Sequence, residues 1–441
     1  MDSQNPNTSN SKPFPTVPTN LEPMAKTVCS PSVGNLRIEE NSHTSRDDSV
    51  VLSQEAPSLM LPILGDEKIS MRGLLALLAQ TKLVSADRVE ALRGEWVKSL
   101  KPHNAEPLAR HLVDTGELTD YQASRLLYGH TDGLRYGEYL AVERLGKGAM
   151  SLVLKAKHHQ TGRIVALKIL SHPAAKSNEV VERLQRECEI GQQLDHPNVL
   201  EIFQVTHHEG CHYVVMEYVE GETFADMVKR GGPMDVKLAV EYMLQATSGL
   251  CYLHSRGVIH RDIKPQNVLV DKQGLLKLLD LGLTRVESLP NTKNTPRVTS
   301  QKLTQSGMVL GTPQYMSPEQ FEDPHEANAQ SDQYALGCTF FFMLTGRPPF
   351  ERATAMETLK SHKQDPIPSL QEFRDDVPPN LEAVMNRMMA KRPADRFPHM
   401  SAVEIALHPF SDRPPMENAE VKTTPISWVK SLFRRQDPAH P

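Results

Sequence analysis

The chain has 441 residues, enough for roughly two to four folding units of 100 to 200 residues each. Its formal net charge of -5 excludes the excess of basic residues that nucleic-acid-binding proteins carry, so no nucleic acid is expected as a partner. Its five cysteines are scattered and have no Cys-x-x-Cys spacing, which excludes a disulfide framework and a zinc site and fits a reducing cytoplasm.

Residues 1–65 are rich in Pro, Ser and Asn and poor in aromatic side chains. Such a segment buries too little apolar area to offset chain entropy, so it is predicted to be disordered. Its first part contains no apolar core and is not expected to act as a signal peptide. The longest apolar run of the chain, residues 335–344, is shorter than the roughly 18 residues that span a bilayer and predicts a buried helix. We therefore expect a cytoplasmic protein without a transmembrane span.

Residues 66–130 carry apolar side chains at helical spacing, and Ser85 and Thr119 are typical of helix N-caps. A pattern that begins at Leu78 and ends at Ser85 recurs 34 positions later, from Leu112 to Thr119. Solenoids of this period usually need about three or more repeats, so the pattern predicts a compact all-α module of two helix pairs. Two interpretations stay open: a passive domain that only packs on its neighbour, or a docking or dimerisation module.

A glycine-rich turn follows between two strand-like runs. Residues 146–153 have the pattern Gly-x-Gly-x-x-Ser-x-Val, in which the missing side chains of Gly146 and Gly148 allow backbone N–H groups to approach phosphates. The motif alone does not distinguish a phosphate loop from an ordinary hairpin turn. The next strand-like run, Ile-Val-Ala-Leu-Lys at 164–168, ends in a lysine, and we predict that Lys168 grips the α- and β-phosphates of a nucleotide.

A lysine in this position requires an acidic partner. The helical stretch 178–194 offers several glutamates, of which Glu187 is the candidate. The residues alone do not separate it from the neighbouring charges Glu179, Glu182 and Glu189.

The string His-Arg-Asp-Ile-Lys-Pro-Gln-Asn at 260–267 predicts a phosphoryl-transfer loop. Asp262 is placed to orient and deprotonate a hydroxyl, and Lys264 can neutralise the moving phosphoryl group. Asn267 can hold a metal ion. A short apolar strand at 275–279 then delivers Asp280, which is predicted to ligate a Mg²⁺ ion that bridges the nucleotide phosphates.

The segment between Asp280 and Glu319 is rich in hydroxyl and basic side chains and predicts a switch. A phosphate on this segment could pair with the guanidinium of Arg261 and order the loop. Residues 411–441 are expected to form a flexible tail with a short basic amphipathic run at 426–435. That run could touch a membrane surface or a partner groove, fray, or dock on the core.

Through these motifs, residues 136–410 resemble a protein kinase of the eukaryotic-like bacterial serine/threonine group. The resemblance implies an α+β, bilobal fold, with a small β lobe and one helix up to about Val219 and a larger helical lobe beyond it. It implies ATP and Mg²⁺ between the lobes and protein Ser/Thr hydroxyls as substrates. In this family, a lysine at position 264 marks serine/threonine rather than tyrosine specificity.

The resemblance also assigns roles residue by residue. The implied nucleotide-binding residues are Gly146, Gly148, Val153, Ala166, Lys168, Met216, Glu217 and Val219. The implied catalytic residues are Asp262, Lys264, Lys168, Glu187 and Thr312, and the implied metal ligands are Asn267 and Asp280. Thr304 and Ser306 occupy positions where related kinases autophosphorylate. Structural roles are implied for Glu319 with Arg396 as its ion-pair partner, and for Asp332 as a brace of the catalytic loop.

Three residues depart from the family pattern: Ser151 replaces the third glycine, Leu281 replaces Phe after Asp280, and Ser317 replaces Ala before Pro318. These departures support an alternative, a pseudokinase scaffold that binds nucleotide or partners without catalysis. Since the residues that touch phosphate or metal in the family are present, the sequence favours an active serine/threonine kinase in signalling.

Overall fold

The computed structural model describes residues 68–96, 104–148, 151–171, 178–280 and 312–412, all within one compact unit, Glu55–Pro441. Four expectations lie wholly or mostly outside these residues: the disordered segment 1–65, the switch between Asp280 and Glu319, its phosphorylation candidates Thr304 and Ser306, and the amphipathic run of the tail. Glu187 lies in a described helix, but its side chain is outside the described set.

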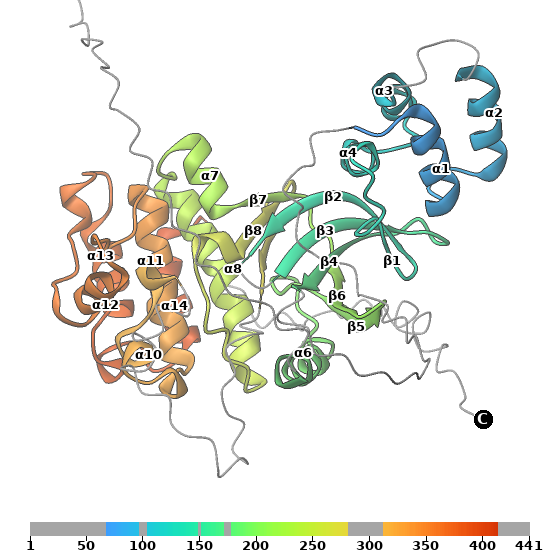
Figure 1. Ribbon diagram of the computed structural model, residues 1–441. Helices are drawn as coiled ribbons and strands as arrows, with labels where there is room; N and C mark the ends of the chain where they lie inside the picture. Colours follow the sequence, from blue (N-terminus) through green and yellow to red (C-terminus); the bar gives the residue numbers. More distant parts are fainter. Residues whose placement is uncertain (1–67, 97–103, 149–150, 172–177, 281–311, 413–441) are drawn as a thin grey trace, which may run out of the picture. The chain divides into compact units, whose positions relative to one another are not determined.

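The first described part of the chain is helical (Figure 1). Its helices are α1 (Met71–Thr81), α2 (Ala86–Trp96), α3 (Glu106–Asp114) and α4 (Asp120–Leu127). These helices enclose a hydrophobic core of their own. Helix α1 contacts α2, and α3 contacts α4, so the helices form two pairs. The two pairs share local details: the Thr81 hydroxyl donates to Leu77 O at 2.8 Å, and the Thr115 hydroxyl donates to His111 O at 2.9 Å. The 34-residue repeat thus corresponds to a repeated helix ending.

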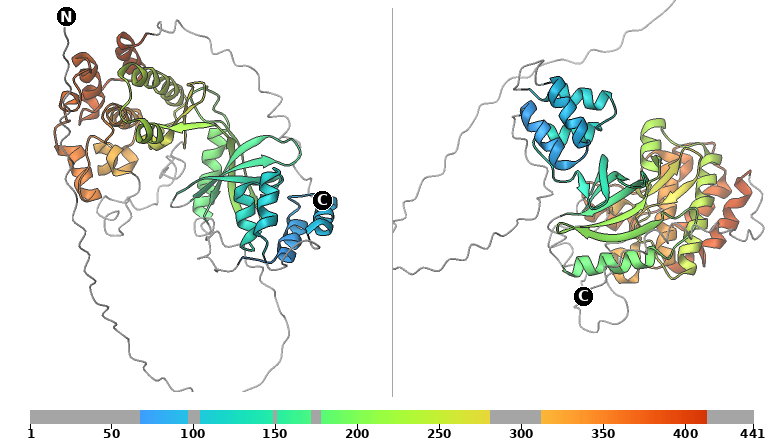
Figure 2. Two further views of the ribbon diagram at one scale, coloured as in Figure 1. Left: turned by 90° about the horizontal axis from the view of Figure 1, so that it is seen from above. Right: turned by 90° about the vertical axis from the view of Figure 1, so that its right-hand side faces the viewer.

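The described strands of the next segment form a six-stranded antiparallel sheet in the order β1-β2-β3-β4-β6-β5. The strands are β1 (Arg135–Tyr136), β2 (Tyr139–Lys147), β3 (Ser151–His158), β4 (Ile164–Leu170), β5 (Ile202–His208) and β6 (Cys211–Glu217). Helix α6 (Asn178–Gly191) packs against β5 and lies along one side of the sheet (Figures 1 and 2). The buried positions of these strands are mostly Val, Leu, Ile and Ala, and of these Val and Ile are favoured in strands.

Strand β4 differs in detail from the sequence expectation. It does not end at Lys168 but continues to Leu170, and Ile164 at its start is 38% exposed. The backbone of Lys168 therefore pairs on both sides, with Val153 in β3 and with Val214 in β6. A lysine inside a sheet is positioned more firmly than one at a strand end, because ladder hydrogen bonds fix its backbone on either side.

The following part is mainly helical and carries a small sheet in the order β7-β8-β9. Its strands are β7 (Gly221–Thr223), β8 (Val268–Asp271) and β9 (Leu276–Leu278). Its α-helices are α7 (Phe224–Gly231), α8 (Val236–Ser255), α10 (Pro318–Glu322), α11 (Ala329–Thr345), α12 (Ala355–Gln364), α13 (Pro379–Met388) and α14 (Met400–Leu407). Among the helices of the described ranges, none combines the length and apolar character needed to cross a membrane. With the sheet on one side and the helices on the other, the molecule has the expected bilobal α+β fold.

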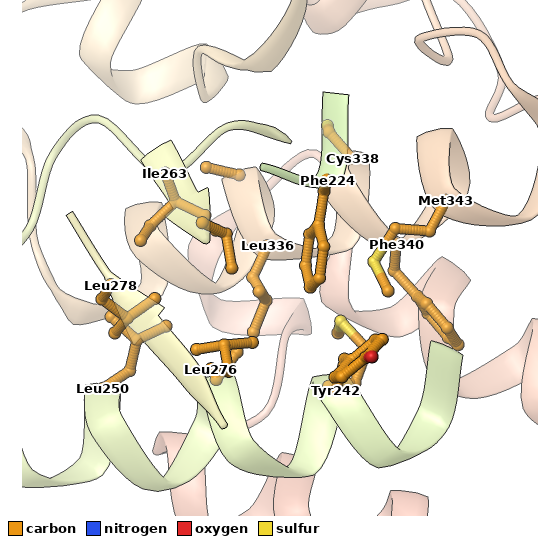
Figure 3. Close-up of a cluster of buried hydrophobic side chains, with 14 of the residues drawn as sticks. Phe224, Tyr242, Leu250, Ile263, Leu276, Leu278, Leu336, Cys338, Phe340 and Met343 are labelled. Atoms are coloured by element: carbon orange, nitrogen blue, oxygen red, sulfur yellow. The ribbon is translucent and has the colours of Figure 1, made fainter. Parts of the chain in front are cut away.

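The core of the helical lobe fixes the segments that carry the predicted chemistry. Ile263 lies between Asp262 and Lys264, and Leu276 and Leu278 precede Asp280; all three apolar side chains are buried. Figure 3 places them against residues of α8 and α11. Full burial of such a side chain contributes about 1.5–3 kcal/mol. The polar residues beside them are therefore attached to a rigid support.

Candidate active site

Four predicted residues form one hydrogen-bonded cluster. The ammonium group of Lys264 lies 2.9 Å from Asp262 Oδ2 and donates to the Thr312 hydroxyl at 3.1 Å. The amide nitrogen of Asn267 donates to Asp262 Oδ2 at 2.9 Å and to Asp262 O at 2.8 Å. The structure thus brings Asp262, Lys264, Asn267 and Thr312 together around one carboxylate, with Asn267 in a 3-10 turn just before β8.

The backbone of this loop is held by a buried carboxylate at the start of α11. Asp332 accepts hydrogen bonds from the backbone N–H groups of His260 at 2.8 Å and Arg261 at 2.7 Å, and its Oδ2 lies 2.8 Å from His254 Nε2. Arg261 adopts a left-handed backbone conformation, φ 64°, which costs a non-glycine residue about 1–3 kcal/mol. The Asp332 contacts offset that strain and fix the direction of Asp262. The His254 contact was not expected from the sequence.

His260 connects the loop to the segment that carries Asp280. Its Nε2 lies 2.8 Å from Leu279 O, and its Nδ1 faces the N–H of Asp262 at 3.4 Å. Burial lowers the pKa of His260 below its ordinary value, so the ring is neutral. A carbonyl can only accept, so Nε2 carries the hydrogen and Nδ1 accepts. One neutral imidazole therefore links Asp262 to the residue before Asp280.

Lys168 and Asp280 form a direct ion pair. The ammonium group of Lys168 donates to Asp280 Oδ1 at 2.6 Å. Burial opposes ionisation of Asp280, but the charge and hydrogen bond of Lys168 outweigh it and lower the pKa of the carboxyl. Asp280 also has a left-handed backbone, φ 48°. Since the side chain of Glu187 is not described, its predicted pairing with Lys168 stays a prediction.

The two predicted metal ligands fit a hard cation. Mg²⁺ prefers oxygen ligands, and Asp280 offers a carboxylate. Asn267 directs its amide nitrogen to Asp262, so the atom it can offer a metal is its carbonyl oxygen. These two residues can therefore hold Mg²⁺ through oxygen atoms alone.

The predicted nucleotide-binding residues include an apolar group between the lobes. Ala166, Leu200 and Met216 form a small buried cluster, and its partly buried neighbours are Val153, Tyr218, Val219 and Leu279. Of these, Ala166, Met216, Val153 and Val219 were assigned to the nucleotide, whereas Leu200 and Leu279 were not. In the sequence, Leu200 and Leu279 are recognisable only as apolar residues near a strand, which does not predict a place in this cluster.

The glycine-rich turn is a β-hairpin end. Gly146 pairs with Val153 across β2 and β3, and Gly148 N–H donates to Ser151 O at 2.8 Å; residues 149–150 are outside the described ranges. A methyl group built at Gly146 would meet no described atom within 4 Å. The glycine is therefore not required by packing at this position, and its open surface leaves room for a ligand.

An ion pair at the end of β6 was missed by the sequence analysis. Lys277 lies in the middle of β9, and its ammonium group donates to Glu217 Oε2 at 2.9 Å. Only 9% of Lys277 is exposed. The available signal was a lysine inside the apolar run 275–279, which was interpreted only as a strand.

A second buried pair closes the helical lobe. Arg396, whose side chain is 0% exposed, holds both carboxylate oxygens of Glu319, at 2.7 and 2.8 Å. Burial raises the pKa of Glu319, but Arg396 outweighs it and lowers the pKa overall. In the same helix, Gln320 accepts from Ser317 N–H at 3.3 Å and donates to Arg261 O at 3.3 Å. Ser317, a departure from the family pattern, occupies the N-cap position of α10, and its hydroxyl donates to Gln320 Oε1 at 3.0 Å.

The family model of the protein kinase domain matches residues 139–411. The chain belongs to the protein kinase domain family. Its kinase domain is 35% identical over 261 residues to the serine/threonine-protein kinase PrkC of Bacillus subtilis. The aligned region covers 59% of this chain and 38% of that protein. It is 33% identical over 302 residues to the serine/threonine-protein kinase PknH of Mycobacterium bovis. The aligned region covers 68% of this chain and 48% of that protein. The chain therefore spans less than half the length of these relatives.

Among solved structures, the kinase domain is similar to Rad53 1-466 in complex with AMP-PNP. The TM-score is 0.50 at 26% sequence identity, and the match covers 62% of this chain and 65% of that one. The expected fold and the expected kinship with bacterial serine/threonine kinases are thereby confirmed.

Proposed function

We propose that this chain is a serine/threonine protein kinase, which transfers the γ-phosphoryl group of ATP to Ser or Thr hydroxyls of proteins. One observation carries the proposal: the Asp262 carboxylate contacts both Lys264 and Asn267. A base, a cation and a metal-binding amide within hydrogen-bond reach of one another are what phosphoryl transfer requires. The names of the bacterial relatives, all serine/threonine-protein kinases, support the same reaction.

In this proposal Asp262 orients the substrate hydroxyl and takes its proton as the bond to phosphorus forms. Lys264 links Asp262 to Thr312 and carries positive charge to the transferred group. Thr312, whose hydroxyl accepts from Lys264, positions the substrate beside Asp262. Catalysis then depends mainly on positioning and on charge neutralisation.

Asn267 and Asp280 are the proposed Mg²⁺ ligands. When bound, Mg²⁺ supplies charge neutralisation to the nucleotide phosphates. Asp280 holds Lys168 in the structure, so binding requires Lys168 to turn its ammonium group toward the α- and β-phosphates. Glu187 of α6 is the proposed residue that holds Lys168 in that position.

The adenine ring is proposed to lie against the apolar cluster that contains Ala166 and Met216. Val153 and Val219 flank it, and the backbone from Glu217 to Val219 is proposed to hydrogen-bond the base. The hairpin end with Gly146 and Gly148 covers the phosphates. AMP-PNP, an ATP analogue, is bound in the similar Rad53 structure, which supports this class of ligand.

Three further proposals come from the sequence. Thr304 and Ser306 are autophosphorylated, and the phosphate pairs with Arg261. The protein acts in the cytoplasm, a proposal that rests on its five scattered cysteines, which lack Cys-x-x-Cys spacing. The helical module 66–130 serves as a docking or dimerisation unit.

The test is incubation of the purified full chain with radiolabelled ATP, MgCl₂ and a generic basic protein. Label is expected in the basic protein and in the chain itself, and chelation of Mg²⁺ should abolish it. Binding of nucleotide without any label transfer would instead favour the pseudokinase alternative. Mass spectrometry of the labelled chain tests Thr304 and Ser306.

A further inference from the structure

The outer edge of strand β2 is only partly covered by another strand. β1 has two residues, and its pairing with β2 ends at Leu140. Ala141, the next residue, would present its N–H and C=O at an open sheet edge. Unpaired backbone groups that are buried cost free energy, so a buried edge residue requires other partners.

Both backbone groups of Ala141 are satisfied by the part of the chain that precedes the sheet. Its N–H donates to Leu134 O at 3.0 Å, and the Leu134 side chain belongs to the core of the helical module. Its C=O accepts from Gln122 Nε2 at 2.8 Å. Ala141 is 0% and Gln122 6% exposed, so water does not compete for either bond. Helix α4 therefore continues the edge that β1 leaves open, and Figure 1 shows α4 beside β2.

The orientation of the Gln122 amide is fixed by chemistry. Its Oε1 accepts from Thr119 N–H at 3.0 Å in the capping box of α4, while its nitrogen faces the Ala141 carbonyl. A flipped amide would place donor against donor and acceptor against acceptor. Tyr121, the adjacent residue, packs against both the module core and the sheet core. The cap of α4 and the attachment of β2 thus share one side chain.

The strand that Gln122 holds leads directly to the glycine-rich hairpin end. Between Ala141 and Gly146, the ladder of β2 with β3 has two register shifts, Ala141/Glu143 and Arg144/Gly146. Such irregularities bend and twist a strand and weaken local pairing. Since the ladder is interrupted there, an anchor at Ala141 has a direct influence on where Gly146 and Gly148 lie.

We propose that Gln122 is a positioning residue for the nucleotide: by holding Ala141, it lets the helical module set the position of the glycine-rich hairpin end and so the affinity for Mg–ATP. The inference rests on the proposed function, because it takes this hairpin end as the phosphate cover. It assigns the helical module an intramolecular role in addition to any docking role.

The structure offers a substitution that separates the two tasks of Gln122. In Gln122→Glu, a carboxylate oxygen still accepts from Thr119 N–H, and glutamate is a standard capping-box residue. At pH 8 the carboxylate is ionised and cannot donate to Ala141 O. Gln122→Met removes both bonds with little change of volume and serves as the second variant. Arg88→Ala is the matched control, because Arg88 is the corresponding position of the first helix pair and bonds Glu117 inside the module.

Four quantities measured on the full chain test the proposal: the dissociation constant of AMP-PNP with MgCl₂, the amide hydrogen exchange of residues 139–148 without nucleotide, and the KM for ATP and kcat from initial rates. Both Gln122 variants should bind AMP-PNP roughly three- to tenfold more weakly, as expected when a buried carbonyl loses its donor. They should exchange faster at 139–148, raise KM for ATP and leave kcat within about twofold of wild type. Arg88→Ala should match wild type in all four.

If wild type binds AMP-PNP and both Gln122 variants bind it with unchanged affinity, this inference is overturned. The proposed function would then remain intact. Equal weakening in Arg88→Ala would also overturn it, because general loss of module stability would then explain the effect. A wild type that binds no AMP-PNP would overturn the proposed function itself, and this inference with it.

Discussion

Lys168 and Asp280 are 112 residues apart in sequence, yet their side chains are joined at 2.6 Å. The lysine comes from within β4 and the aspartate follows β9, so the contact connects the six-stranded sheet to the segment after β9. Each was predicted to contact the same ligand, one through phosphate and the other through metal. The ion pair therefore occupies the position where the two functions would meet, and it must open or be shared when Mg–nucleotide binds.

Replacement of this lysine is the first test of the arrangement. Lys168→Met should lower phosphate transfer by about a hundredfold or more, because a charge that stabilises the transferred phosphates is lost. Lys157→Met, an exposed lysine on the neighbouring strand β3, is the matched control and should keep near-normal activity. Initial rates of phosphate incorporation measure the effect. Wild-type turnover by Lys168→Met would remove Lys168 from the proposed mechanism.

The pair between Lys277 and Glu217 should contribute to stability beside the apolar cluster of Ala166, Leu200 and Met216. Lys277→Met leaves the carboxylate of Glu217 without its cation in a partly buried position, and we expect the free energy of unfolding to fall by about 1–3 kcal/mol. Lys272→Met breaks the exposed pair of Lys272 with Glu220 and should cost clearly less, because solvent screens that pair. Urea unfolding of both variants measures the difference. Equal losses of unfolding free energy in Lys277→Met and Lys272→Met would show that burial does not strengthen the pair between Lys277 and Glu217.

The pair between Glu319 and Arg396 predicts a dependence of stability on pH. Since the folded state lowers the pKa of Glu319 below its ordinary 4.5, its contribution is complete above pH 4.5 and is lost as pH falls through the folded value. Arg396→Met should lose about 3–5 kcal/mol at neutral pH, because a buried carboxylate then lacks its partner.

The difference in unfolding free energy between wild type and Arg396→Met should therefore shrink below pH 4.5. Urea titrations at several pH values measure it, and the subtraction removes the contribution of shared carboxylates. A difference that stays constant down to pH 3 would show that the lowered pKa is not the source of the stabilisation.

The sequence was most informative where the interacting residues are close in the chain. Asp262, Lys264 and Asn267 lie within one short loop, so their proximity follows from chain connectivity alone. Strand β9 and helix α11 were predictable for a related reason, since a buried apolar run leaves few alternatives. The prediction that β4 ends at Lys168 was wrong, because a lysine does not terminate a strand when neighbouring strands pair with its backbone.

Contacts between distant segments were beyond the sequence. Lys277 and Glu217 are 60 positions apart, and periodicity predicts the face on which a side chain lies but not its partner. Gln122 could be recognised as a helix-capping residue from its distance to Thr119. Its bond to Ala141 depends on where β1 ends, and a two-residue strand has no sequence signal of its own.

The most direct test of the central claim is single-turnover transfer by Asp262→Asn, measured together with AMP-PNP affinity. Asparagine keeps an acceptor for Asn267 and Lys264 but cannot take a proton from the substrate hydroxyl, so the fold and the nucleotide affinity should stay close to wild type. We expect transfer to fall by about 10² to 10⁴. Wild-type transfer by Asp262→Asn would contradict the assignment of this carboxylate as the base.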